Sequence, residues 1–420
     1  MMSVNPAARA GGSLGRSALK EKNCSMHNNL PCRIGNMIVL LLVLGPCLAA
    51  RAPAGQTGAP QKPLTAEDVF KNVQDLKGIP VNQFMEAMGF FSAALGYNCT
   101  NCHGTEVLGN WAKYADETPE KRVARRMIQN VNIINRTLFG GRQAVTCYTC
   151  HRGSPTPKTV PSLLEQYSAP PEDDPNDVEP SPRASKTQSV DEILNRYMQA
   201  LGGAKSLGAL TSVVAKGSYE GFDSYHGKVA VEVYAKATGE RSVIAHTQNG
   251  DSVTTYNGRD AWIMGPDKPV SVLQLASGGD LDGVKLDSIL AFPGGLKQAL
   301  SQPRTGFPTT TIGDHPVDVV QALAGSSRVK LFFDKQTGLL SRVVLFHNTI
   351  VGPVPTQIDY SDYREVAGVK MPFQWRLTWM DGQSTYTLDD VRPNVAIDPG
   401  KFAKPVAPAP RLVAPAKLPQ

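Results

Sequence analysis

Two copies of the pattern Cys-x-x-Cys-His are the residues with the clearest chemical meaning in this chain. They comprise Cys99, Cys102, His103, Cys147, Cys150 and His151. Two thiols three residues apart can each add to a vinyl group of a haem, and the adjacent histidine can then bind the iron as its proximal ligand. The repeated pattern therefore predicts two covalently bound haem c groups.

Three other uses of these four cysteines fit the sequence less well than haem. Zinc ribbons separate their Cys-x-x-Cys pairs by about 15 to 20 residues, whereas 44 residues lie between Cys102 and Cys147. A dithiol redox site has one pair beside a βαβ pattern, which this sequence lacks. Two structural disulfides would leave both histidines unexplained. Covalent haem is the interpretation that uses all six residues.

The sixth iron ligand decides what such a haem does. An open position permits peroxide chemistry, and a dihaem peroxidase-like enzyme is the alternative function. A thioether ligand gives a closed electron carrier, which is a non-enzymatic role and the one we predict. Three methionines lie between residues 64 and 160. We predict Met88 and Met127 as ligands, with Met85, one turn earlier, as the alternative to Met88.

Helices must position these ligands. Thr65 and Asp68 form an N-cap pattern for a helix that continues to Leu76. Further helices are expected over residues 82–95, ending at Gly96, and from Thr118 to Gly140, with apolar residues at a period of 3.6. The last two helices each lead into a Cys-x-x-Cys-His peptide, so residues 64–160 are predicted to form a small all-α dihaem module.

This module resembles the cytochrome c subunit of photosynthetic reaction centres. The resemblance is carried by residues 84–103, by 123–127, by Ile134 and Asn135, and by 145–153. In that family each helix supplies a methionine to the haem bound just after it, which implies Met88 with His103 and Met127 with His151. Familiar members bind four haems. The iron of one of these haems has as a ligand a histidine from the region that corresponds to residues 136–146. This chain has no histidine there and only two binding peptides, so the resemblance implies a two-haem relative.

The N-terminal segment, residues 1–50, is called the leader here, and its sequence predicts that the protein is exported. Residues 1–50 contain a basic start, a short apolar run beginning at Met37 and small residues after it, which is typical of a signal peptide or an N-terminal membrane anchor. Residues 51–63 read as a linker. The expected location is the periplasm, and the expected partner is a redox protein there or at the membrane surface, a reaction centre among the candidates.

Length and charge limit the remaining functions. A chain of 420 residues is suited to two or three domains. Its net charge of +6 is carried by residues 1–63, which hold seven Lys and Arg against one Glu. Residues 64–160 carry +3 and residues 161–420 carry −3. Residues 64–420 together are therefore neutral, which argues against a basic surface that binds nucleic acid.

The C-terminal part is predicted to be a mostly antiparallel β domain over residues 189–404. An acidic, Pro-rich linker precedes it at 161–188, and a Pro/Ala-rich tail at 405–420 is expected to be disordered. Ser189 and Glu192 predict a capped helix, and alternating segments predict strands. These strands lie near residues 228–234, 329–334 and 386–391.

The segment Asp359–Phe373 loosely resembles the periplasmic lipoprotein-carrier superfamily, a half-barrel that holds an acyl chain. This resemblance implies an apolar ligand in the β domain. The domain also contains four histidines without ligand spacing, which we expect to be ordinary surface or core residues: His226, His246, His315 and His347. The complete prediction is a multidomain α + β chain, an all-α dihaem c-type cytochrome module followed by a β half-barrel-like domain.

Overall fold

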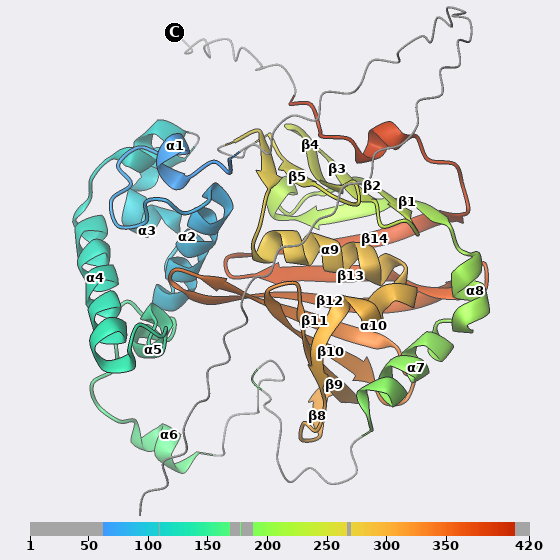
Figure 1. Ribbon diagram of the computed structural model, residues 1–420. Helices are drawn as coiled ribbons and strands as arrows, with labels where there is room; N and C mark the ends of the chain where they lie inside the picture. Colours follow the sequence, from blue (N-terminus) through green and yellow to red (C-terminus); the bar gives the residue numbers. More distant parts are fainter. Residues whose placement is uncertain (1–61, 109, 169–176, 178–187, 267–269, 408–420) are drawn as a thin grey trace, which may run out of the picture. The chain divides into compact units, whose positions relative to one another are not determined.

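The computed structural model describes residues 62–108, 110–168, 177, 188–266 and 270–407 (Figure 1). The predicted leader, nearly all of the linker before residue 64, most of the acidic linker and the end of the predicted tail lie outside these residues. Among the described helices, none is long and apolar enough to cross a membrane.

Helices and loops make up the described residues 62–168. The helices are α1 (Ala66–Val69), α2 (Val81–Leu95), α3 (Cys99–His103), α4 (Pro119–Phe139), α5 (Cys147–His151) and α6 (Leu163–Tyr167), with 3₁₀ turns η1 (Thr105–Val107) and η2 (Trp111–Ala115). The expectation of a helix from Thr65 to Leu76 was wrong, because α1 ends at Val69 and Phe70 is extended. The N-cap of α1 is as predicted, since Thr65 N donates to Asp68 Oδ2 at 2.8 Å.

The two long helices begin and end at the residues that the sequence marks. Pro80 precedes α2, and Gly96 ends it in the left-handed conformation at φ 64°. Thr118 caps α4, Pro119 is its first residue, and Gly140 ends it at φ 61°. Glycine adopts this conformation without the steric cost of a Cβ atom.

Residues 188–407 form a large antiparallel sheet with a few helices. Its fourteen strands are β1 (Ser212–Gly221), β2 (Lys228–Lys236), β3 (Arg241–Thr247), β4 (Gly250–Tyr256), β5 (Ala261–Met264), β6 (Val272–Leu275), β7 (Leu300–Arg304), β8 (Thr310–Ile312), β9 (His315–Ala324), β10 (Ser327–Asp334), β11 (Leu340–Thr349), β12 (Gly352–Val366), β13 (Val369–Trp379) and β14 (Gly382–Pro393). The helices are α7 (Val190–Ala200), α8 (Gly203–Ala209), α9 (Gly279–Ala291) and α10 (Leu296–Ala299), with 3₁₀ turns η4 (Phe222–Ser224), η5 (Pro293–Gly295) and η6 (Pro399–Phe402). The three predicted strands correspond to β2, β10 and β14.

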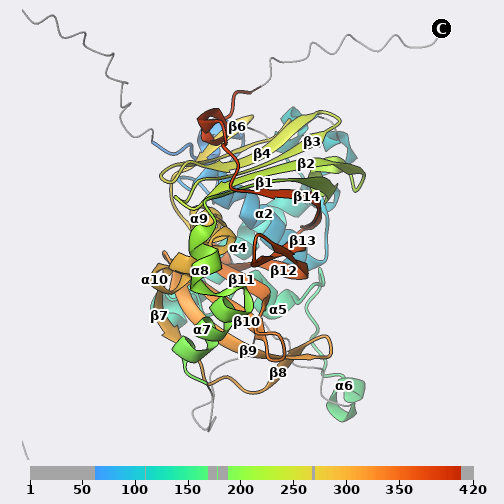
Figure 2. The same cartoon turned by 90° about the vertical axis from the view of Figure 1, so that its right-hand side faces the viewer.

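The strand order is β6-β5-β4-β3-β2-β1-β14-β13-β12-β11-β10-β9-β7, and β8 pairs with β9. Helix α9 contacts β4 as well as β9 and β11, which are far apart in this order, so the sheet curves around the helix (Figures 1 and 2). This arrangement confirms the prediction of a mostly antiparallel, half-barrel-like domain.

Apolar packing between helices and sheet stabilises this domain. Ile193 and Tyr197 of α7 and Leu286 of α9 pack against Val329 and Leu331 of β10, and all five are nearly or fully buried. The capping box that starts α7 is formed as predicted, because Ser189 N donates to Glu192 Oε2 at 2.7 Å and Ser189 Oγ accepts from Glu192 N at 3.2 Å.

Candidate functional site

The two Cys-x-x-Cys-His peptides have the same local structure. Each is a one-turn helix, α3 over Cys99–His103 and α5 over Cys147–His151. Residues three and four positions apart lie on the same side of a helix. Each turn therefore presents both sulfurs and the imidazole to one side, which is the arrangement needed to hold a single flat macrocycle.

Polar caps fix where each turn begins. Asn98 Oδ1 accepts from Thr100 N at 3.0 Å, and Asn98 N donates to Asn101 Oδ1 at 2.8 Å. In the second peptide Thr146 N donates to Thr149 Oγ1 at 3.0 Å. The second variable position of each pattern thus carries a small polar side chain that closes the cap, Asn101 in α3 and Thr149 in α5.

The two histidines are suited to bind a metal through a neutral imidazole. Nδ1 of His151 lies 2.9 Å from the carbonyl oxygen of Ser154. A proton on Nδ1 donated to this carbonyl leaves the lone pair of Nε2 free for a metal. Burial, followed by the charge of Lys121, lowers the pKa of His103 to about 4. At neutral pH this imidazole is therefore uncharged and able to coordinate.

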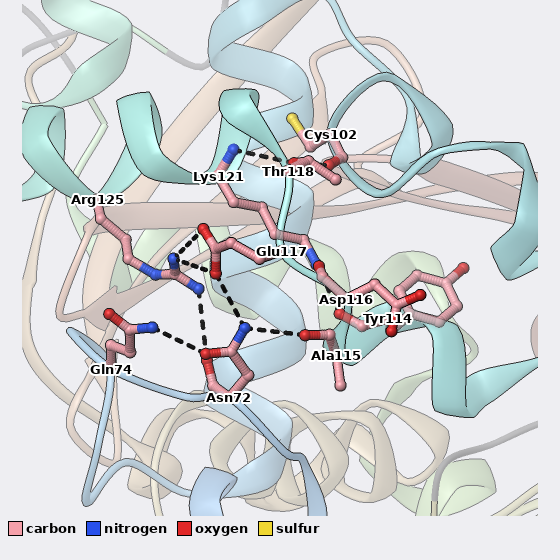
Figure 3. Close-up of polar contacts among 10 residues, drawn as sticks. All are labelled: Asn72, Gln74, Cys102, Tyr114, Ala115, Asp116, Glu117, Thr118, Lys121 and Arg125. Carbon is pink, nitrogen blue, oxygen red and sulfur yellow. Dashed lines mark hydrogen bonds and ion pairs between the residues drawn. The ribbon is translucent and has the colours of Figure 1, made fainter.

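A network of side chains attaches the first peptide to α4 (Figure 3). Thr118 Oγ1 donates to the carbonyl oxygen of Cys102 at 2.7 Å and accepts from Lys121 N at 3.2 Å, so one hydroxyl caps α4 and holds the end of α3. Lys121 Nζ donates to the carbonyl oxygen of Tyr114 at 2.7 Å. The Tyr114 ring lies 4.8 Å from the His103 ring, centroid to centroid.

The same network continues to the loop after α1. Arg125 pairs with Glu117 at 2.7 Å, and Asn72 Nδ2 donates to Ala115 O at 2.9 Å and to Glu117 Oε2 at 3.0 Å (Figure 3). Asn72 has a left-handed φ of 61°, a conformation that asparagine tolerates better than most residues. The loop, η2 and α4 are joined in this way around His103.

Asn135 positions the second peptide. This buried residue of α4 is 6% exposed. Its Nδ2 donates to Val145 O at 2.7 Å, and its Oδ1 accepts from Ala144 N at 3.0 Å and from Val145 N at 2.9 Å. The segment immediately before Cys147 is thus held against α4.

An apolar stripe on α4 is not covered by other described residues. Val123, Met127, Ile134 and Leu138 lie on one side of the helix, and Met127 is 39% exposed. An amphipathic helix buries such a stripe against a partner. A flat apolar macrocycle held by α3 or α5, both of which contact α4, fits this requirement.

The methionines of α2 differ in their surroundings. Met88 is partly buried and packs against a cluster of Ala87, Phe90 and Val354. Met85 is 38% exposed. Helix α2 contacts α5, and Gly153 N, just after the second peptide, donates to Ala94 O of α2 at 2.9 Å.

The four cysteines are free and separate in the described part of the chain. They do not form a common group with metal-ligand spacing there, so one four-cysteine zinc site is not formed. Burial raises the pKa of Cys102 and of Cys147, which disfavours the thiolate that a zinc or dithiol site requires. The donor set, the uncharged imidazole of His103 and the apolar stripe all fit haem.

Sequence comparison gives the family resemblance. Residues 47–200 match the model of the family "Photosynthetic reaction centre cytochrome C subunit". Curated relatives include the photosynthetic reaction center cytochrome c subunits of Thermochromatium tepidum, 37% identical over 110 residues (25% of this chain and 25% of the relative), and of Rubrivivax gelatinosus, 35% identical over 114 residues (26% and 30%). The chain thus spans about a quarter of the length of these relatives.

Solved structures similar to this chain match about half of it. A LolA superfamily protein from Nitrosomonas europaea aligns with a TM-score of 0.36 at 13% identity, covering 52% of this chain and 99% of its own. A DUF1329 family protein from Desulfovibrio piger aligns with a TM-score of 0.37 at 11% identity, covering 52% and 98%. At these TM-scores the likeness carries no conclusion about function. It is the N-terminal part of the chain, with its two Cys-x-x-Cys-His peptides, that is similar in sequence to the cytochrome c subunit of photosynthetic reaction centres.

Proposed function

We propose that the protein is an exported dihaem c-type cytochrome that carries single electrons, similar to the subunit that re-reduces the photo-oxidised pigment pair of a reaction centre. The observation that carries this proposal is the pair of matching capped turns, α3 and α5, each with two cysteines and a histidine on one side. When bound, each haem supplies an iron couple that gains and loses one electron.

The residues of this chain would hold, orient and shield the two haems. Cys99 and Cys102 would form the thioether bonds of the first haem, and Cys147 and Cys150 those of the second. His103 and His151 would be the proximal ligands. The hydrogen bond to Ser154 O fixes the ring of His151, and burial keeps His103 uncharged.

For the sixth ligands we propose Met88 with His103 and Met127 with His151, with Met85 as the alternative to Met88. This pairing follows from the resemblance, in which each helix serves the haem bound after it. Because α4 contacts both α3 and α5, the exposed thioether of Met127 is supplied from a helix that borders both peptides. A thioether favours ferrous iron and raises the reduction potential.

We propose further that residues 64–160 act as the haem module and that the leader exports it, so electrons are exchanged in the periplasm. A reaction centre is the partner favoured by the family match at residues 47–200. Another periplasmic acceptor is the alternative, because the chain has two binding peptides where the familiar four-haem members have four.

Pyridine haemochrome analysis of the full-length protein, produced in a host with a c-type maturation system, tests the central proposal. We expect two covalent haems per chain, and one haem each in Cys102→Ala and Cys150→Ala. A chain that matures with none, or that holds zinc or disulfides in place of thioethers, would overturn it. Co-purification from native membranes tests the partner separately.

A cavity in the β domain favours an additional function, the binding of an apolar ligand. It has a volume of about 120 Å³ and is lined mostly by aliphatic and aromatic side chains, with Arg241 and Asp287 3.7 Å apart at its wall. Engineered apolar cavities of about 150 Å³ bind benzene, so this cavity suits a ring or the end of an apolar chain. Native mass spectrometry of the purified full-length protein should detect such a ligand, and Ala215→Leu, which narrows the cavity, should reduce its occupancy. An occupancy equal to that of the wild type would contradict this role.

A further inference from the structure

Three ligand-type side chains from distant parts of the sequence meet beside helix α2. Glu86 lies on α2, Asp280 on the first turn of α9, and His347 on β11. One potential ligand atom from each residue lies within 4.8 Å of the other two. The expectation that His347 is an ordinary surface or core residue took no account of these two acidic residues, which lie 261 and 67 positions away in the sequence.

The imidazole of His347 directs one nitrogen at both carboxylates. His347 is 4% exposed. Its Nδ1 lies 2.8 Å from Glu86 Oε1 and 3.9 Å from Asp280 Oδ1. Asn82 Nδ2 donates to the other carboxylate oxygen of Asp280 at 2.9 Å, which leaves Oδ1 directed at the histidine. The three side chains thus point toward one another, and the hydrogen bond from Asn82 holds the Asp280 carboxylate in this orientation.

In the described part of the chain, no lysine or arginine forms an ion pair with Glu86 or Asp280, and the basic group that faces both carboxylates is His347. A protonated His347 would offset one of their two negative charges and leave the other unbalanced. Two carboxylates that are mostly removed from water are costly without a compensating cation. A divalent cation bound by both carboxylates and a neutral imidazole would bring the net charge of the group to zero.

The three ligand atoms lie close enough together to bind one metal ion. Zinc binds imidazole nitrogen and carboxylate oxygen at about 2.0 to 2.2 Å, which separates tetrahedral ligands by about 3.3 Å. The observed separations of 2.8 and 3.9 Å lie on either side of this value. Nε2 of His347 is buried and has no hydrogen-bond partner. It lacks a partner whether the proton of the neutral ring is on Nδ1 or on Nε2. A metal bound at Nδ1, which places the proton on Nε2, therefore creates no additional unpaired group.

We propose that Glu86, Asp280 and His347 form a binding site for a divalent transition metal, with zinc as its simplest occupant and water as a fourth ligand. The site is distinct from the haem peptides. It would join α2, which carries Met85 and Met88, to α9 and β11 of the β domain. The bound metal would thus cross-link the helical residues 62–168 to the β domain and stabilise their contact.

Gly279, at the start of α9, packs closely against the ring of His347. A Cβ atom at Gly279 would lie 2.1 Å from Cγ of His347, so only glycine allows the start of α9 to approach the ring this closely. This approach is what brings the neighbouring Asp280 to the imidazole.

Zinc titration of the full-length, haem-loaded protein tests the proposal. After dialysis against a chelator, isothermal titration calorimetry with zinc chloride should give one saturable site per chain, and elemental analysis should find one zinc beside the haem iron. Glu86→Gln, Asp280→Asn and His347→Gln should each weaken this binding at least tenfold. All three variants keep the four cysteines, so a lost site cannot be assigned to the cysteines.

His246→Gln is the matched control. His246 is also paired with a carboxylate, Asp251, at 2.8 Å, but the pair is exposed, and its replacement should leave zinc binding unchanged. Wild-type protein without a stoichiometric site would overturn the proposal, as would unchanged binding in Glu86→Gln and Asp280→Asn. If a variant fails to fold, anomalous diffraction at the zinc edge from zinc-soaked wild-type crystals decides the question, because a peak is expected between the three side chains and its absence contradicts the site.

Discussion

Asn135 and Val145 are joined by two hydrogen bonds, one in each direction. The Asn135 side chain donates to the carbonyl oxygen of Val145 at 2.7 Å and accepts from its amide nitrogen at 2.9 Å. With a third bond from Ala144 N, one buried amide holds the segment that leads into Cys147. A single side chain of helix α4 therefore helps to fix the position of the second Cys-x-x-Cys-His turn.

Replacing this amide should loosen the second haem peptide. Asn135→Ala removes three hydrogen bonds, and we expect the free energy of unfolding to fall by about 2 to 4 kcal/mol, because each buried bond contributes about 1 kcal/mol. Denaturant titration of the full-length protein measures this change, and haemochrome analysis should show incomplete haem at Cys147 and Cys150. Asn130→Ala, at an exposed position of the same helix, should change neither quantity. Equal stability of the two variants would contradict the role given to Asn135.

Thr118 connects the first Cys-x-x-Cys-His peptide to α4. Thr118→Ala should cost about 1 kcal/mol of stability through the lost helix cap, and it also removes the hydrogen bond to Cys102 O. Thr118→Ser keeps the hydroxyl and should behave like the wild type in thermal unfolding. A serine variant as unstable as the alanine variant would indicate that the methyl group, rather than the hydroxyl, matters.

The sixth ligands can be assigned by spectroscopy. Ferric haem with a thioether ligand has a weak charge-transfer absorption at the red end of the visible spectrum, and we expect half of its intensity to disappear in Met127→Ala and half in Met88→Ala. Loss in Met85→Ala in place of Met88→Ala would assign the alternative ligand on α2. Retention of the full absorption in all three variants, together with rapid peroxide turnover by the wild type, would instead favour a peroxidase-like enzyme with an open iron.

Gly279 should be intolerant of a side chain. Gly279→Ala places a methyl group within 2.1 Å of the His347 ring, and overpacking of this kind costs about 1 to 3 kcal/mol. Thermal unfolding should show the loss. Gly208→Ala, in helix α8 where nothing lies within 4 Å of the added atom, should be neutral or slightly stabilising. A Gly279→Ala protein as stable as the wild type would show that α9 can move away from the ring.

Asp334 should make the β domain sensitive to acid. Burial acts to raise the pKa of Asp334, but hydrogen bonds from Thr337 and Gln336 outweigh it and the pKa is lowered. A carboxyl group whose pKa is lower in the folded state stabilises the fold above its unfolded value of about 3.9, and this contribution is lost as the pH falls through the folded pKa. Denaturant titration between pH 7 and pH 2 should therefore show a steeper loss below about pH 4 for the wild type than for Asp334→Asn. Parallel curves for the two proteins would contradict this assignment.

The sequence was most informative where structure is decided locally. Thr118 and Pro119 at one end and Gly140 at the other define α4, and Ser189 with Glu192 starts α7, because caps act within one turn. The first helix was predicted too long, because its apolar spacing continues to Leu76. The chain is already extended at Phe70, and the left-handed turn at Asn72, held by contacts with Ala115 and Glu117 more than 40 positions away, keeps the following residues out of a helix.

Relationships across long sequence separations could not be predicted. The hydrogen bond from Asn72 to Ala115 and the meeting of Glu86 with His347 depend on how distant elements pack, and no spacing in one sequence encodes them. The resemblance includes Asn135, but the role of its side chain could not be predicted, because a spacing of ten residues from Val145 gives no local signal of a hydrogen bond. The six residues of the two Cys-x-x-Cys-His peptides, in contrast, can be recognised from their spacing alone.

The pairing of β1 with β14 has a consequence for how the chain matures. The first and last strands of the sheet are antiparallel neighbours, paired from Val213 opposite Pro393 to Gly221 opposite Ser384, with one shift of register between Lys216 and Gly217. If the chain is exported in N-to-C order, as proposed above, β1 through β6 and β9 through β13 cross the membrane before β14, the strand that joins β1 to β13. We therefore expect the complete sheet to form only when β14 arrives, and a chaperone that shields unpaired strand edges would protect the nascent protein from aggregation until then.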